Sequence, residues 1–191
     1  MTDEHRTIRG GGGIVSRGGE RSAARAIAEG DIPALMRGWR RRWASGIAVA
    51  TTTDAAGAFR GITLTGVLSV ALEPPLVALS LTSDGAFLGI LRESGRCALH
   101  ILDRDQDFTA ERFAGRAPVP DGRFGGVPHT VVDGLPVLDG ALAWAIGDVE
   151  RIDAHGDHAL AIVRVTAGTL ADDTDDPLLS YEGRYRGLEA S

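Results

Sequence analysis

The chain has 191 residues, of which 43% are apolar, and this is enough to build one substantial hydrophobic core. All 20 basic residues are arginine, so the absence of lysine excludes Schiff-base catalysis and a P-loop lysine. The net charge of −6 is uneven, because residues 1–43 hold nine Arg against five Asp or Glu (+4) and the remainder carries −10. An acidic body of this kind argues against nucleic acid as the main partner.

Neither a membrane-spanning segment nor a secretory signal is expected from the sequence. No run approaches ~18 uninterrupted apolar residues, and the first residues, MTDEHRTIRGGGG, lack the apolar middle of a signal peptide. Cys97 is the single cysteine, which excludes an internal disulfide and is typical of a reducing compartment. We therefore expect a cytoplasmic protein without membrane contact.

The N-terminal region is expected to divide into a tail and a helix. Residues 1–30 are glycine-rich and arginine-rich and show no sustained periodicity, which predicts a disordered tail ahead of a single domain over residues 31–191. An amphipathic helix is expected to begin at Asp31, a good N-cap residue, and to continue to Trp43. Its arginine cluster at residues 40–42 is interpreted as a solvated surface, with phosphate or nucleic-acid contact as the alternative.

The most distinctive stretch is residues 61–81, GITLTGVLSVALEPPLVALSL. The side chains of residues 62–70, many of them β-branched, predict one buried strand, because β-branched side chains fit a pleated surface better than a helix, and the apolar run at residues 76–81 has the length of a second. Pro74 and Pro75 exclude a helix and place a rigid corner between the strands. Thr63 and Thr65 fall on one face of the first strand, where their hydroxyls could meet a ligand that lies against the sheet.

The other expected elements are mostly strands. Strands are predicted over residues 46–53, 97–102, 141–151 and 160–169. Helices are predicted over residues 87–93 and 106–113, and turns over residues 54–57 and 153–157. Irregular or loop structure is predicted over residues 82–85, 117–128 and 172–176. Gly95 is expected to end the first of these helices. Strands at short spacing without a βαβ rhythm favour a closed antiparallel barrel over a doubly wound sheet.

Three types of site are weighed and set aside. The glycine run at residues 10–13 has neither the preceding strand nor the spacing of a phosphate-binding loop. His129, His155 and His158 lie too far apart in sequence for a metal motif. No Gly-x-Ser-x-Gly pentapeptide supports acyl transfer. The hydroxyl-bearing strand and the turn at residues 156–158 remain as candidate elements of a site, and a structural role is open for each of them.

Eight segments match the pattern of one known family in the right order. They are residues 41–52 (RRWASGIAVATT), 61–70 (GITLTGVLSV), 73–77 (EPPLV), 92–95 (RESG), 134–138 (GLPVL), 156–158 (GDH), 177–179 (PLL) and 183–185 (GRY). On these residues the chain resembles the flavin reductase domain family, in which a small component uses NAD(P)H to reduce flavin for a partner monooxygenase. The similarity covers about residues 32–188.

The resemblance implies a mainly β, six-stranded antiparallel Greek-key split barrel with a few flanking helices. It also implies a homodimer that binds FMN or FAD near the subunit interface and takes hydride from NADH or NADPH. His158 is implied to position and polarise the nicotinamide carboxamide as the catalytic residue. The residues implied to bind cofactor are Thr63, Leu64, Thr65, Gly66, Ser69, Thr82, Ser83, Asp84, Gly85, Phe87, Gly156 and Asp157.

Two residues depart from the family's pattern on the cofactor side. Gly66 stands where the family commonly has a serine, and Asp84 stands in the loop that usually offers hydroxyls to the flavin phosphate. A carboxylate ~4 Å from a phosphate charge costs about 1 kcal/mol in water and about 4 at a protein surface. We therefore expect Asp84 to weaken FMN binding relative to riboflavin, unless an arginine neutralises the site; alternatively, Asp84 caps the helix that follows.

Three functions are carried forward on these grounds. The first is an NAD(P)H-dependent flavin reductase that supplies a partner oxygenase. The alternative is a flavin-binding or ligand-binding split barrel without reductase activity, which serves a pathway by binding or by non-redox catalysis. A third, weaker alternative is an interaction protein that acts through its arginine-rich tail.

Overall fold

The computed structural model describes residues 31–117, 122–171 and 176–188. The expected tail at residues 1–30, and most of the expected acidic loop at residues 172–176, lie outside this part of the chain. The strands are β1 Ser45–Gly46, β2 Ala48–Thr53, β3 Phe59–Leu64, β4 Val67–Ala71, β5 Leu76–Thr82, β6 Arg96–Ile101, β7 His129–Val132, β8 Leu135–Leu138, β9 Ala143–His155, β10 His158–Leu170, β11 Leu179–Tyr181 and β12 Arg184–Arg186. The helices are α1 Ile32–Arg42, α2 Ala86–Ser94 and α3 Asp107–Phe113, with a 3₁₀ turn at Arg104–Gln106.

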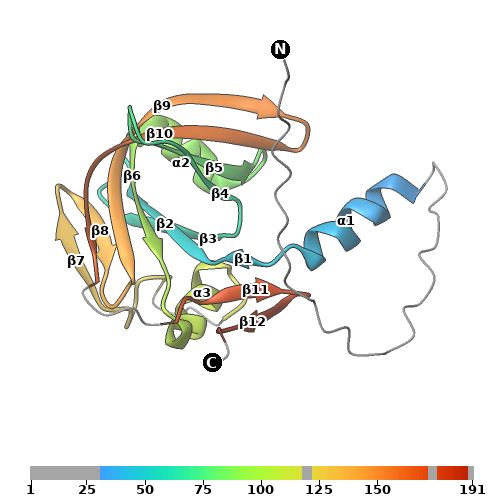
Figure 1. Ribbon diagram of the computed structural model, residues 1–191. Helices are drawn as coiled ribbons and strands as arrows, with labels where there is room; N and C mark the ends of the chain where they lie inside the picture. Colours follow the sequence, from blue (N-terminus) through green and yellow to red (C-terminus); the bar gives the residue numbers. More distant parts are fainter. Residues whose placement is uncertain (1–30, 118–121, 172–175, 189–191) are drawn as a thin grey trace, which may run out of the picture.

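The main sheet is antiparallel and curls into a split barrel (Figure 1). Its strand order is β3-β2-β6-β9-β10-β5-β4, so its two edge strands are consecutive in the chain. Only Thr65 and Gly66 join these edges, which forces the edges to meet at that end while the sheet stays open along the rest of β3 and β4. The expected mainly β, antiparallel split barrel is confirmed, with seven strands in its main sheet where six were expected.

The extra strand arises within residues 61–71, where one buried strand was predicted. The chain breaks at Thr65 and Gly66 and yields β3 and β4, because the sheet must turn back on itself there. Leu68, Ser69 and Val70 on β4 are exposed, so the expectation of a wholly buried strand was wrong for this half. The corner at residues 73–75 is present as a turn that contains a cis peptide bond before Pro74.

The hairpin of β9 and β10 is longer and tighter than the sequence predicted. Both strands run for 13 residues, and only Gly156 and Asp157 lie between them, so the five-residue turn expected at residues 153–157 was wrong. Gly156 has a φ of 63°, a conformation that a two-residue hairpin loop requires and that glycine adopts without strain. In the sheet, His158 pairs with His155 of β9 on one side and with Thr82 of β5 on the other.

Two of the expected helices pack into the core. α2 buries Phe87, Leu88 and Leu91 against the barrel interior, and Gly95 ends it in the left-handed conformation, as expected. α3 covers β3, where the ring of Phe113 lies against the backbone of Gly61. The hairpins β7–β8 and β11–β12 were not predicted as strands, because segments of three or four residues carry too little alternation to be recognised.

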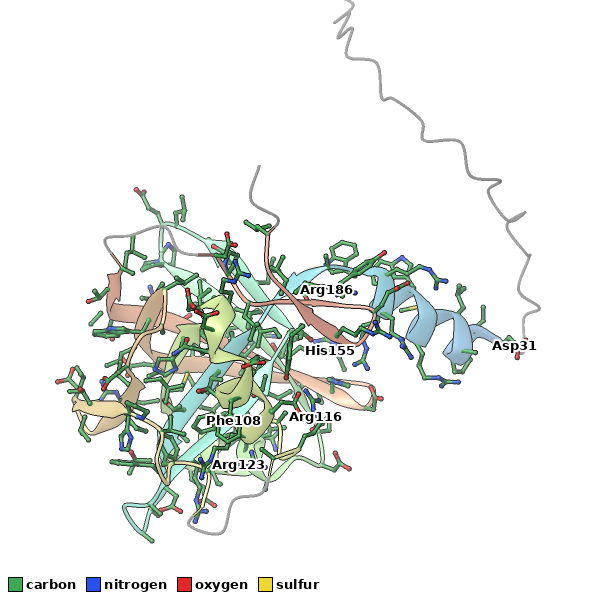
Figure 2. The ribbon with its side chains drawn as sticks, turned by 90° about the horizontal axis from the view of Figure 1, so that it is seen from below. Asp31, Phe108, Arg116, Arg123, His155 and Arg186 are labelled. Carbon is green, nitrogen blue, oxygen red and sulfur yellow. The ribbon has the colours of Figure 1, made fainter. Side chains whose placement is uncertain are left out.

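The expected N-terminal helix forms, but none of its residues is buried. Figure 2 shows α1 projecting from the barrel with Asp31 at its outer end. Its inner end is fixed to the β11–β12 turn, because the backbone N–H of Glu182 donates to the carbonyl of Arg41 at 2.7 Å and the Arg41 guanidinium donates to the carbonyl of Glu182 at 3.1 Å. Within the described ranges, no helix is long and apolar enough to cross a membrane.

His100 on β6 is a fully buried polar side chain of the core. Its Nδ1–H donates to the Val49 carbonyl at 2.9 Å, and its Nε2 has no hydrogen-bond partner among the described residues. Burial lowers the pKa of His100 from 6.5 to about 4, although the hydrogen bond to Val49 opposes this shift. The imidazole of His100 is therefore uncharged in the folded protein at neutral pH.

We expect the free energy of unfolding to fall as the pH drops from about 6.5 to about 4. In this window the unfolded chain protonates His100 and the folded chain does not, which gives a contribution of up to about 3 kcal/mol. Urea unfolding at several pH values should show this slope in the wild type and lose most of it in His100→Asn. Equal slopes in the two proteins would contradict the assignment.

Candidate functional site

A groove of about 690 Å³ lies between α1, the end of β3, the end of α3 and the β11–β12 hairpin. The backbone contacts between Arg41 and Glu182 hold two of these walls together. The residues that line the groove are Trp39, Arg40, Arg41, Trp43, Ser45, Ile47, Thr63, Leu64, Thr65, Gly66, Glu111, Ala114, Arg116, Ser180, Gly183, Arg184 and Tyr185. Four of the residues predicted to bind cofactor, residues 63–66, therefore share one concave surface.

The two threonines of this wall differ in what they offer a ligand. The Thr63 hydroxyl donates to the Ala110 carbonyl on α3 at 2.6 Å, so its proton is already used. Thr65 is exposed, and its side chain makes no hydrogen bond to any of the described residues. Thr65 is therefore the threonine whose hydroxyl is free to donate into the groove.

Gly66 is required by a close approach of the β3–β4 link to β5. A Cβ atom at this position would lie 2.8 Å from the Cβ of Ser80, a separation that real side chains do not adopt. The Ser80 N–H also donates to the Gly66 carbonyl at 2.8 Å, which holds the two backbones together. The departure from the family's serine therefore has a steric reason in this chain.

We expect Gly66→Ser to lower the free energy of unfolding by about 1–3 kcal/mol, the usual cost of overpacking. Adding Ser80→Gly should recover part of that loss, because it removes the Cβ that the new side chain meets. Ser80→Gly alone is the control for the cost of a glycine in a strand. Strictly additive effects in urea unfolding would show that the two residues do not collide.

The loop at residues 82–85 and the turn at residues 156–158 form one cluster beside the groove. Thr82 pairs with His158 across β5 and β10, and the Ser83 N–H donates to the Asp157 carbonyl at 2.9 Å. The cluster adjoins the groove because Ser80, two residues before Thr82, carries the contact to Gly66. The structure thus brings together the two candidate elements that were identified separately in the sequence.

His158 is oriented by its neighbour in the turn. Its Nδ1–H donates to the Asp157 carboxylate at 2.8 Å, which leaves Nε2 for a ligand. The pKa of Asp157 lies below its usual value, because His158 donates this hydrogen bond and, more weakly, because the charge of Arg40 is near. The same effect of Arg40 shows that the inner end of α1 reaches toward this cluster.

Nine residues of the predicted set do not line the groove: seven belong to the cluster at residues 82–85 and 156–158, and the other two are Ser69 and Phe87. Phe87 places its side chain in the core, Ser69 is exposed on β4, and Asp84 is exposed in its loop. The N-cap of α2 is Gly85 and no side chain caps it, so the alternative in which Asp84 caps the helix was wrong. That Asp84 weakens FMN binding relative to riboflavin stays a prediction, to be measured with Asp84→Ser.

A network of polar side chains from α3, the following loop and β12 lines part of the groove, and sequence reasoning missed it. Arg116 pairs with Glu111 at 2.6 Å, and the Tyr185 hydroxyl donates to the same carboxylate at 2.6 Å. These hydrogen bonds lower the pKa of Glu111 to about 2, and burial together with the negative neighbour raises the pKa of Tyr185 to about 12. The one signal in the sequence was Tyr185 within the matched segment at residues 183–185.

The three histidines considered as metal ligands do not come together in the part of the chain that the structure describes. No group of three His, Cys, Asp or Glu side chains suited to a metal ion occurs in the described ranges. His155 and His158 pair across their hairpin, whereas the His129 imidazole packs among the rings of Phe59 and Phe124. His129 is half-buried against these rings, which is a packing role.

Comparison with known proteins identifies the family. The model of the flavin reductase like domain matches residues 40–189, which is most of the chain. The chain belongs to the flavin reductase like domain family. Among relatives of this family, an NADH-dependent flavin reductase from Rhodococcus sp. is 34% identical over 159 residues, which cover 82% of this chain and 87% of that protein.

Two further members of the flavin reductase family are similar over most of their length. The reductase subunit HsaB of a flavin-dependent monooxygenase from Rhodococcus jostii is 31% identical over 164 residues, which cover 85% of this chain and 81% of that subunit. The solved structure of the flavin reductase PheA2 superposes with a TM-score of 0.75 and 33% identity, and the match covers 82% of this chain and 98% of that one.

Proposed function

We propose that the protein is an NADH-dependent flavin reductase that supplies reduced flavin to a partner oxygenase. The single observation that carries this proposal is the groove formed by residues 63–66, the stretch that resembles the family's flavin-binding segment, with the His158 cluster beside it. The names of the relatives support the same activity, since they include an NADH-dependent flavin reductase and the reductase subunit of a monooxygenase. We take NADH over NADPH, and FMN or FAD as the flavin, on this basis.

The groove fits a flavin in size and charge. Its volume of about 690 Å³ lies within the roughly 300–1,000 Å³ of small-molecule sites. Leu64 and Ile47 give it an apolar wall, and Arg40 and Arg184 give it positive charge suited to a phosphate. Thr65, with the backbone of Leu64 and Gly66, would hold the ring system in the groove.

A bound flavin supplies the hydride acceptor, and this chain's residues supply binding and orientation. Donors from Thr65 and the adjacent backbone would favour the negative charge that develops on the ring as it is reduced. The Asp157 carboxylate fixes the proton of His158 on Nδ1, so that Nε2 is held ready to bind the nicotinamide carboxamide. Thr82, Ser83 and Gly156 shape the border of that position.

We further infer a homodimer in the cytoplasm, with the flavin near the subunit interface. Apolar residues of α1, such as Trp39, and of β4 are exposed in a single chain, as is Trp43 directly after α1. Apolar surface of this kind is typical of an association face. A dimer at micromolar concentration in light scattering would support the inference, and a monomer would contradict it.

The test of the proposed function is NADH consumption with added FMN, FAD or riboflavin, followed at the nicotinamide absorbance band. We expect turnover that depends on the added flavin. Flavin binding seen by calorimetry together with no NADH consumption would favour the alternative, a split barrel that binds flavin or another ligand without reducing it.

A further inference from the structure

α1 carries an apolar stripe that is open to solvent in a single chain. Ile32, Leu35, Met36 and Trp39 recur at the spacing of one helix face, and each of them is between 38% and 53% exposed. The inner end of the helix is fixed to the β11–β12 turn, whereas its outer half projects away from the barrel (Figure 2). Because short helices in proteins are stabilised mainly by packing of their apolar face, a partner is expected to cover this stripe.

A second apolar surface lies on the outside of the barrel, across β4, β5 and β10. Its central row is in register on the three strands, because Ala78 of β5 pairs with Leu68 on one side and with Ile162 on the other. Leu79 and Ala161, which alternate with these residues, belong to the core, so the row faces outward. β4 is moreover an edge strand without a charged residue, and such an edge is normally covered. We call this surface the outer face, formed by Leu68, Ala78, Leu160 and Ile162.

The helix and the outer face are complementary in charge and in length. Arg37, Arg40 and Arg42 of α1 are exposed and make no salt bridge with any described residue. Glu73 and Asp84, which flank the two ends of β5, are exposed and likewise unpaired in the described ranges. The 11 residues of α1 extend about 16 Å, and the seven residues of β5 extend about 23 Å. A second copy of the chain therefore offers each surface the partner that it lacks.

We propose that two copies of the chain exchange their N-terminal helices, so that α1 of each copy lies on the outer face of the other. Ile32, Leu35 and Met36 pack on Leu68 and Ile162 of the second copy, and the arginines of the helix neutralise the carboxylates at the ends of β5. The contact is intermolecular, because no residue of α1 is buried in a single chain. Each copy gives one helix and receives one, which is a closed twofold arrangement. The inference rests on the homodimer of the proposed function and assigns the surfaces that form it.

The exchanged helix also borders the cluster that holds His158. His158 alternates with Leu160 and Ile162 along β10, so the three side chains share the outer face, and His158 pairs there with Thr82 of β5. A helix on Leu160 and Ile162 therefore closes the side of the cluster that is open in a single chain. It follows that the position proposed for the nicotinamide is complete only in the dimer.

The first experiment mixes two full-length chains with different tags, one carrying Met36→Cys and the other Leu68→Cys, and treats them with a short bismaleimide. We expect cross-linked pairs that carry both tags and almost none that carry one tag twice. The natural Cys97 does not interfere, because it is buried and burial raises the pKa of its thiol to about 12. Two results would overturn the inference: Met36→Cys linked to itself, which indicates paired helices, or Leu68→Cys linked to itself, which indicates paired β4 edges, each in place of the mixed product.

The second experiment compares Met36→Ser with Ala34→Ser by sedimentation over a dilution series. Met36 lies on the apolar stripe, and Ala34 lies on the opposite side of the same helix turn. We expect Met36→Ser to raise the dissociation constant of the dimer roughly tenfold or more, because it removes a buried apolar side chain from the interface. Ala34→Ser should change this constant by less than about twofold. Equal dissociation constants for the two variants would contradict the exchange.

The same dilution series tests the effect on the site. The KM for NADH of Met36→Ser should match the wild type while the variant is dimeric and rise as it is diluted to the monomer; a KM that does not change on dilution would contradict a helix that completes the site. Cross-linking and sedimentation need neither flavin nor NADH, so their failure leaves the proposed flavin reduction untouched. A monomeric wild type contradicts the homodimer and the exchange alike, whereas a dimer with the wrong cross-links contradicts the exchange alone. Circular dichroism spectra of both serine variants should match the wild type and so exclude misfolding.

Discussion

Phe113→Ala is expected to lower the free energy of unfolding by about 3–5 kcal/mol, the largest effect of any substitution considered. The Phe113 ring is fully buried at the end of α3 and packs edge-on against Phe124 at 5.0 Å between ring centroids. It also fills the space above Gly61, where a Cβ atom would lie 2.6 Å from the ring. Truncation leaves a cavity that the backbone of β3 cannot fill.

The measurement is urea or thermal unfolding, with Phe108→Ala as the matched control. Phe108 lies on the same helix, but 59% of its surface is exposed, and the Arg112 guanidinium lies over its ring at 5.8 Å from the centroid. We expect this control to cost less than about 1 kcal/mol. A loss below about 1.5 kcal/mol for Phe113→Ala would show that α3 relaxes onto the sheet.

The parts of the fold that the sequence predicted are those with local causes. Alternation marked β2, the apolar run at residues 76–81 marked β5, and glycine in the left-handed conformation ended α2 at Gly95 as expected. The break at Thr65 and Gly66 was missed, because its cause is a contact with Ser80 that is 14 residues away and becomes visible only once the sheet curls. Short strands such as β11 also depend on partners and not on their own pattern.

The same difference between local and long-range causes decides which residues of the candidate site could be predicted from the sequence. Thr65 and His158 were found from motifs in single segments. The Arg116, Glu111 and Tyr185 network was not, since its members come from α3, the following loop and β12. The arginines of α1 were interpreted as a solvated face, with phosphate contact as the alternative. The structure places Arg40 and Arg41 in the groove because the β11–β12 turn fixes the inner end of the helix, a constraint from the far end of the chain.

His158→Ala is expected to lower kcat/KM for NADH by roughly tenfold to a hundredfold, the range for loss of one well-oriented hydrogen bond in a transition state. Flavin affinity should change by less than about twofold, because His158 belongs to the cluster beside the groove and not to the groove wall. The physical basis is the hydrogen bond to Asp157, which fixes the imidazole so that only Nε2 faces a substrate.

The control for this prediction is His155→Ala, which removes the imidazole directly opposite on the same hairpin. It imposes the same change in side-chain volume and charge on β9, where no nicotinamide contact is proposed. We expect His155→Ala to keep the wild-type kcat/KM and both variants to lose a similar, small amount of thermal stability. If His158→Ala keeps its NADH kinetics and loses only stability, His158 is a packing residue and the hydride donor is oriented by other groups.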